Sequence, residues 1–392
     1  MKVKLKALLI CLTSPKPATA LKLFIITSAM ILSVPALSSD TLKVKFRSRA
    51  LMDATISGYG QDDTQGYFRL EDFRVGFKGT YGKYEIKADI GLGGGKVAVK
   101  DLLLNYHFKN GVLSLGNAYE PFSLDMLIST ADLRFNQSAA SVLAFTNSRK
   151  LGLTYHFHNK NWCIATGLYT NNDINQLGDS KKNSLVSTSR AVWRKQNGRH
   201  SRLWHIGGAF SYRTKEVNKE RPAGKISSAG VTSMFPESLL EANIDNMGSE
   251  LKGLFEILYT SRKTLLQGEY FVERINRSNS SNAYHAHGGY VQGSWLIKGT
   301  GFEYDAMYGI PGRPASDKAI ELVMRFNHTD LNDSKSNIYG GEEKDLSLGA
   351  NFYLNRYIGI KVNVSYTWVG RHCNNFYDKD FLLAQARLQY IF

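Results

Sequence analysis

The chain has 392 residues, of which 43% are apolar and 21% are charged, and its formal net charge is +15. This composition excludes an intrinsically disordered chain, which would combine a high net charge with too few apolar residues to bury. It leaves room for one large domain or two ordinary ones.

The N-terminus predicts a secretory signal peptide at residues 1–38. This segment holds five lysines and no acidic residue, followed by an apolar run from Leu21 to Leu37 and then by small residues. A retained membrane anchor is the alternative, but the run meets Pro35 before it reaches the roughly 18–20 residues of a spanning helix. Residues 39–392 then form one domain. Its charge is 44 minus 34, or +10, which favours an anionic solute or contacts with lipopolysaccharide without choosing between them.

Beyond residue 38 no apolar stretch is long enough to cross a bilayer as a helix. An exported chain can also span a membrane as a closed barrel, in which all backbone groups are paired within the protein. The first strand pattern, residues 42–50, places Lys43, Lys45, Arg47 and Arg49 on one face. In a barrel these cations would line the lumen.

The remaining chain repeats this alternation between short turns and loops. Including the first, about sixteen segments are found, an even number as in bacterial single-chain barrels. The further segments are 67–81, 84–92, 97–108, 112–115, 149–157, 162–170, 185–195, 203–213, 251–260, 264–275, 285–297, 318–331, 344–354, 357–369 and 381–392.

The connections alternate in length. Turns such as 159–160, 261–263 and 355–356 are tight, which suits one rim of a barrel, and long loops suit the other rim. We therefore predict an all-β fold, a transmembrane antiparallel β-barrel of about sixteen strands. The connections expected to be long are 56–66, 116–145, 214–246, 299–317 and 370–380.

The last segment ends on Tyr390, Ile391 and Phe392. An amphipathic strand with a C-terminal aromatic residue resembles the closing strand of bacterial outer-membrane barrels. That resemblance implies that Tyr390 and Phe392 serve as the signal read by the barrel-assembly machinery.

Other chemistries lack a signature. Cys163 and Cys373 lie in different contexts, so a disulfide framework is not supported. The pairs His156/His158 and His285/His287 lack a third ligand at metal-site spacing. The glycines at 91–95 precede no helix that would present amides to a phosphate. We predict no enzyme activity, no cofactor, no metal and no nucleic-acid partner.

Several blocks, in order along nearly the whole mature chain, resemble the phosphate-selective porins of the O and P type. Leu113–Asp125, with Pro121 and Phe122 as its strongest match, is similar to the start of that family's third loop, which folds inward and constricts the pore. The other blocks are Trp204–Arg213, Gly289–Gly299, Ala319–Phe326, Leu346–Asn355 and Leu388–Phe392.

The resemblance implies a sixteen-stranded trimeric porin of the bacterial outer membrane, with long loops folded inward and a ladder of basic residues that passes phosphate or related oxyanions. Arg49 matches a ladder arginine, and Arg69 matches the first of two adjacent arginines, the second being Leu70 here. In the fifth loop, Lys219, Arg221 and Lys225 stand where the family has an arginine-rich run.

The third loop departs from the family. Phosphate-specific members carry a lysine where this chain reads Ser129–Asp132, and Arg134 is the candidate substitute. We therefore expect an anion-preferring channel for passive uptake of small solutes, without assuming phosphate specificity. The expected pore-lining residues are Lys45, Arg47, Arg49, Arg69, Arg74, Arg134, Lys219, Arg221 and Lys225.

Two other classes stay open: an occluded barrel that acts as a binding or adhesin protein, and an outer-membrane hydrolase. The expected partners are small anionic solutes, outer-membrane lipid and lipopolysaccharide, the barrel-assembly machinery and two further copies of the chain.

Overall fold

The computed structural model describes residues 41–59, 63–93, 96–176, 184–197, 202–216, 223–278, 281–375 and 379–392. The expected signal peptide at residues 1–38 lies outside the described residues. So do two of the expected pore-lining cations, Lys219 and Arg221.

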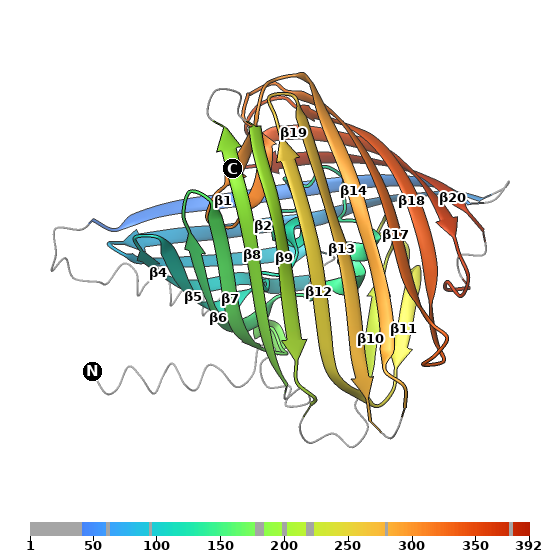
Figure 1. Cartoon of the computed structure of the whole chain (residues 1–392). Helices are drawn as coiled ribbons and strands as arrows, with labels where there is room; N and C mark the ends of the chain where they lie inside the picture. Colours follow the sequence, from blue (N-terminus) through green and yellow to red (C-terminus); the bar gives the residue numbers. More distant parts are fainter. Residues whose placement is uncertain are drawn as a thin grey trace.

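Sixteen antiparallel strands form one closed barrel, and β20 pairs with β1 to close it (Figure 1). The predicted fold class is confirmed. In the described part of the chain, no helix is long and apolar enough to cross a membrane. The barrel strands are β1 (Lys43–Tyr59), β2 (Asp63–Tyr81), β3 (Tyr84–Gly93), β4 (Lys96–Phe108), β5 (Gly111–Ala118), β6 (Lys150–His158), β7 (Trp162–Thr170), β8 (Leu185–Asn197), β9 (Arg202–Arg213), β12 (Met247–Thr260), β13 (Thr264–Arg277), β14 (Tyr284–Lys298), β17 (Ile320–Asp333), β18 (Ile338–Tyr353), β19 (Ile358–Val369) and β20 (Phe381–Ile391).

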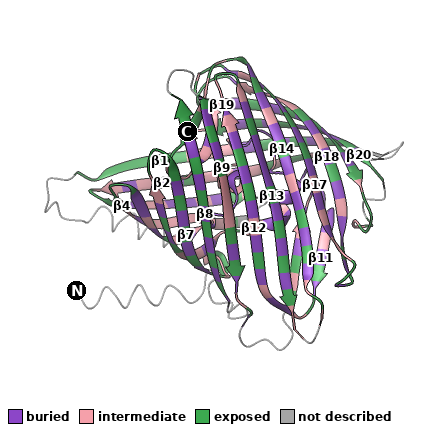
Figure 2. Ribbon diagram, viewed as in Figure 1, coloured by how far each residue is buried: buried purple, intermediate pink, exposed green. Residues whose placement is uncertain are grey.

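Exposed and buried residues alternate along the strands (Figure 2). In β20, Leu382 and Leu388 point outward and are about half exposed, whereas Gln385 and Arg387 point inward and are buried. Because successive side chains leave a strand on opposite faces, an apolar outer face and a polar inner face require this period of two. The alternation predicted from the sequence is therefore the alternation between outer face and lumen.

The antiparallel order defines two rims. The chain ends of the barrel and the tight turns, such as that between β18 and β19, share the short-turn rim. The opposite, long-loop rim is the lower one in Figure 1. The connection expected at residues 56–66 is mostly strand, because the β1–β2 pairing continues to Tyr59 and Asp63. That prediction of a long loop was wrong.

The connection between β14 and β17 was expected among the long loops of the opposite rim, and this prediction was also wrong. It leaves the twelfth barrel strand, so it lies on the short-turn rim with the chain ends. It forms a hairpin of β15 (Phe302–Asp305) and β16 (Ile310–Pro314). We call residues 299–319 the rim hairpin.

Two loops of the long-loop rim fold into the barrel. The third loop, residues 119–149, contains α3 (Leu124–Leu127) and α4 (Ala140–Phe145). The fifth loop, residues 214–246, contains the hairpin of β10 (Gly224–Ser228) and β11 (Leu240–Ile244). The fourth loop has one short 3-10 helix, Ile174–Gln176.

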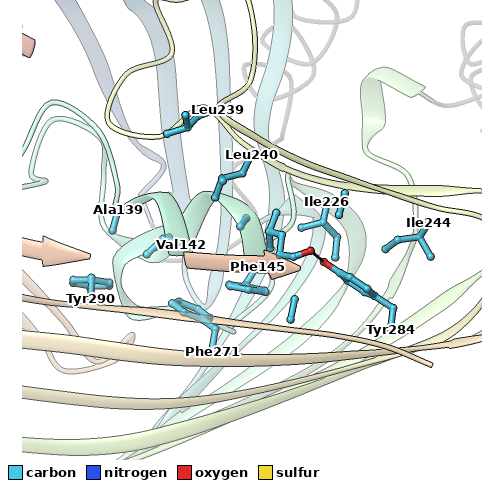
Figure 3. Close-up of a cluster of buried hydrophobic side chains, with 14 of the residues drawn as sticks. Ala139, Val142, Phe145, Ile226, Leu239, Leu240, Ile244, Phe271, Tyr284 and Tyr290 are labelled. Carbon is cyan, nitrogen blue, oxygen red and sulfur yellow. Dashed lines mark hydrogen bonds between the residues drawn. The ribbon is translucent and has the colours of Figure 1, made fainter. Parts of the chain in front are cut away.

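The barrel has an apolar core inside its lumen (Figure 3). There α4 is packed between the fifth-loop hairpin and the wall, with Phe145 stacked on Phe271 of β13 at 5.7 Å between ring centroids. Ile226 and Leu240 of the hairpin belong to the same buried cluster. Each fully buried side chain of this size contributes about 1.5–3 kcal/mol, so the two loops are packed parts of the fold.

Candidate functional site

Two cavities lie between the third loop and the wall formed by β1–β6. The first, of about 310 Å³, is lined by Arg47, Arg49 and Arg74 and is called the basic cavity. The second, of about 720 Å³, is lined by Tyr119, Tyr304 and Tyr308 and is called the tyrosine cavity. The two cavities are adjacent, and six lining residues are common to both: Lys87, Asp101, Tyr119, Leu127, Ile128 and Ser129.

The strand register places cations directly opposite cations on this wall. Arg49 of β1 is paired with Arg74 of β2, and Lys45 is paired with Lys78. Lys78 is paired in turn with Lys87 of β3. Like charges directly opposite each other destabilise a sheet. The register therefore gathers positive charge on this part of the wall, across three neighbouring strands.

Acidic residues balance part of this charge. Asp72 accepts from Arg49 at 2.5 Å and forms an ion pair with Arg74 at 3.2 Å, so one carboxylate serves two guanidinium groups. The Nε of Arg74 is buried and has no hydrogen-bond partner among the described residues. The side chains of Arg49 and Arg74 are 10% and 15% exposed, so they remain within reach of a solute.

Asp101 is likewise shared by two cations. It accepts from Lys87 at 2.5 Å and from Arg149 at 2.6 Å. The Arg149 guanidinium lies 4.2 Å from the ring centroid of Tyr119, in a cation–π contact. In the described part of the chain, five cations line the basic cavity against three carboxylates.

Lys100 adds a further cation behind this wall. Its side chain lies over Gly91, where a Cβ would come within 2.5 Å of the lysine Cε. A larger side chain at position 91 would displace the end of this lysine. Among the described residues Lys100 has no ion-pair partner, which adds to the positive balance of the wall.

Arg49 also reaches the third loop, where its Nη1 donates to the Ser129 hydroxyl at 2.7 Å. The loop and the wall approach each other here, beside the basic cavity. We take this junction as the candidate constriction.

The wall across the barrel holds the third loop by its backbone. Glu269 of β13 accepts hydrogen bonds from the backbone N–H groups of Leu124 and Asp125, at 2.7 and 3.1 Å, and from the Ser123 hydroxyl at 3.1 Å. Tyr290 donates to the same carboxylate at 2.8 Å. Glu269 therefore caps the start of α3 and fixes the loop in the lumen.

Inward cations of β17–β20 bind carbonyl groups of the same loop. Lys361 donates to the Ala131 carbonyl at 3.1 Å, and Arg325 donates to that of Gln137 at 2.8 Å. Such main-chain contacts leave no side-chain motif in the loop, so sequence reasoning had no signal from which to find them.

Three expected pore-lining residues, Arg47, Arg49 and Arg74, lie on the basic cavity. Lys45 is exposed near the start of β1, on the same face of the strand as Arg47 and Arg49. Pro121 and Phe122 belong to the inward third loop, and Phe122 packs 6.3 Å from Phe271 on the wall.

Three other candidates, Arg69, Lys225 and Arg134, lie away from both cavities. Arg69 is bound to Glu71 and to the fifth loop, through the Ser233 hydroxyl at 2.7 Å. Lys225 is paired with Glu241 across the β10–β11 hairpin at 3.0 Å.

Arg134 is 2% exposed and is not part of either cavity wall. It lies 3.3 Å from the carboxylate of Glu321 and donates to the Gly312 carbonyl at 2.6 Å. Its guanidinium thus joins the third loop, the wall and the rim hairpin.

Sequence reasoning missed Lys87, Lys100, Arg149 and Tyr119 as site residues. Lys87 had a detectable signal, since it lies on the polar face of an alternating segment opposite a basic strand. Arg149 and Tyr119 had none, because they flank the third loop at its two ends and meet through the β5–β6 pairing.

The rim hairpin enters the lumen and is held there by β8. Arg190 donates to the carbonyls of Tyr308 and Gly309, at 2.6 and 2.9 Å, and is paired with Glu256 at 2.8 Å. Arg194 donates to the Ala306 carbonyl. Burial raises the pKa of the Tyr308 phenol to about 12, so this side chain is neutral at physiological pH.

Elsewhere in the lumen, several buried cations are paired with acids. Arg213 binds Glu250 at 2.8 Å, and Arg387 binds Asp53 through two contacts of 2.6 Å. Arg387 is 1% exposed. The inward cations that line a cavity are therefore gathered on the β1–β4 side of the lumen and at Arg149.

The histidine pair of β14 lies outside the lumen, with His285 and His287 on the exposed face of the strand. No three His, Cys, Asp or Glu side chains in the described ranges lie close enough together to hold a metal ion.

A family model described as phosphate-selective porin O and P matches residues 43–392. The chain belongs to this family. An "uncharacterized protein" of Caulobacter vibrioides is 23% identical over 313 residues, which is 73% of this chain and 58% of that protein. The chain therefore spans less than two thirds of the length of this relative.

Solved outer-membrane proteins share the fold. In vitro folded OmpT of Vibrio cholerae, in its trimer form, matches with a TM-score of 0.58 and 11% identity over 90% of this chain and 100% of that one. OprB of Pseudomonas putida matches with a TM-score of 0.55 and 12% identity over 89% and 94%. The outer membrane channel DcaP of Acinetobacter baumannii matches with a TM-score of 0.51 and 11% identity over 90% and 97%. The chain is thus a member of a porin family with the fold of bacterial outer-membrane barrels.

Proposed function

We propose that this porin is an anion-preferring channel for the passive uptake of small solutes such as phosphate or other oxyanions. The observation that carries the proposal is the basic wall beside the Arg49–Ser129 junction, where cations outnumber carboxylates. A narrow lumen with low-dielectric walls focuses the field of such a cluster and raises the local concentration of anions.

The arrangement also suits conduction. Lys45, Lys78 and Lys87 lie side by side on successive strands nearer the short-turn rim, and Arg49 and Arg74 lie deeper. Several moderate sites in series let an ion enter and leave, whereas one very tight site would block flow. Shared carboxylates such as Asp72 weaken each single site without removing the positive balance.

Broad anion preference fits the site better than phosphate specificity. The third loop presents a neutral hydroxyl, that of Ser129, where it meets the ladder. Arg134, the candidate loop cation, is engaged with Glu321. Among the described residues, the cations at the junction therefore come from the barrel wall and from Arg149, the last residue of the third loop.

We also propose a homotrimer. A trimer form is described for OmpT of Vibrio cholerae. In this chain the strands β4–β6 carry an apolar outer face, with Leu104, Leu115 and Leu153 about half exposed. The remaining proposals are contact with lipopolysaccharide, delivery by the barrel-assembly machinery and removal of residues 1–38 on export.

An occluded barrel is the second candidate, because the third loop, the fifth-loop hairpin and the rim hairpin all pack against the inner face of the barrel. Purified protein in a planar bilayer separates the two. The channel hypothesis predicts ohmic conductance and, in a KCl gradient, a reversal potential that shows chloride preference. Cation preference contradicts the basic-ladder assignment, and a folded barrel without conductance contradicts the channel. Absence of lipid or peptide turnover in detergent is expected, since we propose no enzymatic role.

A further inference from the structure

The tyrosine cavity differs in chemistry from the basic cavity beside it. Its wall is formed largely by rings and aliphatic side chains, among them Tyr119, Tyr308, Leu103, Ile310 and Pro311. Ligand pockets of about 300–1,000 Å³ that bind organic molecules have such apolar walls with a few polar groups. A small inorganic oxyanion needs neither this volume nor these rings.

The rim hairpin supplies much of this wall, and its position is set by backbone contacts. Arg190 binds the Tyr308 carbonyl, and Cys163 donates its Sγ–H to the Met307 carbonyl at 2.9 Å. The Tyr308 ring meets His156 edge to face, with 4.9 Å between centroids. The ring faces the cavity from a fixed backbone, which is the preorganisation that ligand binding favours.

The charges of the tyrosine cavity are mainly negative. Glu303 and Asp305 of the hairpin and Asp132 of the third loop line it. Asp132 is paired with Arg313, and Asp305 accepts backbone N–H groups of its own turn. A solute with a second anionic group would place that group near these carboxylates, which disfavours polyanions here.

We propose that the two cavities together bind a small organic anion that has one anionic head and an uncharged ring. The head lies among the cations of the basic cavity, and the ring lies against Tyr119 and Tyr308. This inference rests on the proposed function, because it takes for granted that anions enter the lumen, and it narrows the substrate class to amphiphilic monoanions.

Three probes test the class by isothermal titration calorimetry on the full chain in detergent. Benzoate has one head and a ring, inorganic phosphate has no ring, and succinate has two heads. We expect benzoate to bind at least about tenfold more tightly than either of the others, a difference of about 1.4 kcal/mol. Equal or tighter binding of phosphate or succinate overturns the inference.

Variants locate the site. Tyr308→Ala should weaken benzoate binding about fivefold or more and leave phosphate binding within about twofold, whereas Tyr308→Phe keeps the ring and should behave as the native chain. Tyr357→Ala is the matched control, because Tyr357 lies on the short-turn rim, is 43% exposed and lines neither cavity. Unchanged benzoate binding in Tyr308→Ala contradicts the assignment.

Reversal potentials separate this inference from the proposed function. Chloride preference together with equal affinity for benzoate and phosphate leaves the channel assignment intact and removes the substrate class. Cation preference together with tight, Tyr308-dependent benzoate binding removes the anion-preferring channel assignment and leaves the substrate class intact. Heat-modifiable migration on a gel verifies that each variant is folded.

Discussion

Arg49 and Ser129 are joined by a hydrogen bond of 2.7 Å, although they lie 80 residues apart in the chain. This bond connects the first barrel strand to the third loop at the edge of the basic cavity. The cation that we propose to face the solute is therefore also a contact that positions the loop opposite it.

Replacing Arg49 tests the charge of the ladder. Arg49→Ala should lower the chloride-to-potassium permeability ratio about two- to fivefold, because it removes a focused charge and leaves Asp72 less compensated. Arg49→Lys should retain most of the preference. Lys195→Ala, on the exposed face of β8, is the control for loss of a lysine-sized cation outside the lumen. Equal ratios in Arg49→Ala and Lys195→Ala would contradict the assignment.

Removing the cap of the third loop should loosen the constriction. Glu269→Ala leaves the backbone N–H groups of Leu124 and Asp125 without their acceptor. Each such loss costs about 1–3 kcal/mol, so the free energy of unfolding should fall by about 2–4 kcal/mol and single-channel noise should rise. Urea unfolding and bilayer recordings measure the two effects. Tyr270→Phe, on the exposed neighbouring position, should change neither.

Deleting the rim hairpin tests whether it narrows the pathway. A chain that lacks residues 302–314, with a short glycine linker in their place, should conduct about twofold more current than the native chain, because the hairpin forms one wall of the tyrosine cavity. Chloride preference should remain, since no residue of the basic wall is removed. Conductance equal to that of the native channel would show that solutes pass elsewhere.

Removing the last residue should affect assembly rather than conduction. The side chain of Phe392 is 63% exposed, and its backbone exchanges hydrogen bonds of 2.9 and 2.8 Å with Ser48. We expect deletion of Phe392 to reduce the folded, heat-modifiable fraction in the outer membrane severalfold, with normal conductance in the channels that do assemble. Phe392→Tyr should preserve assembly. Full assembly of the deleted chain would rule out a signal at this residue.

The Arg134–Glu321 pair is expected to act in stability. Arg134→Ala leaves a carboxylate that is 0% exposed without its cation, at a cost of about 3–5 kcal/mol. Arg134→Ala combined with Glu321→Ala should recover part of this loss, as measured by urea unfolding. The reversal potential should match that of the native chain, because Arg134 lines neither cavity.

Much of the barrel could be predicted from the sequence because its main signal is local. Alternation along β20 identifies the outer face without knowledge of any partner strand. The rim of each connection also follows from counting strands, since antiparallel order alternates the rims. That count, applied to residues 299–317, would have corrected the error about the rim hairpin. The extent of β1 and β2 required the pairing of Tyr59 with Asp63.

The site was harder to predict because the charge of a side chain does not reveal which residues it contacts in the fold. The sequence alone does not distinguish the roles of Arg49, Arg69 and Arg134, because all three are arginines. In the fold, Arg49 faces a cavity, Arg69 meets Glu71 and the fifth loop, and Arg134 is enclosed beside Glu321. The positive balance depends on which carboxylates lie nearby, and cross-barrel contacts such as those of Glu269 leave no local pattern.

The sequence by itself determined the strand alternation, the even strand number and the basic face of the first strand, because these depend on periodicity within a segment. Only the tertiary structure decided which cations remain uncompensated, where the third loop is held and that the rim hairpin completes a second cavity with Tyr308. Those features arise from contacts between residues far apart in the chain, and closure of the barrel sets the distances among them.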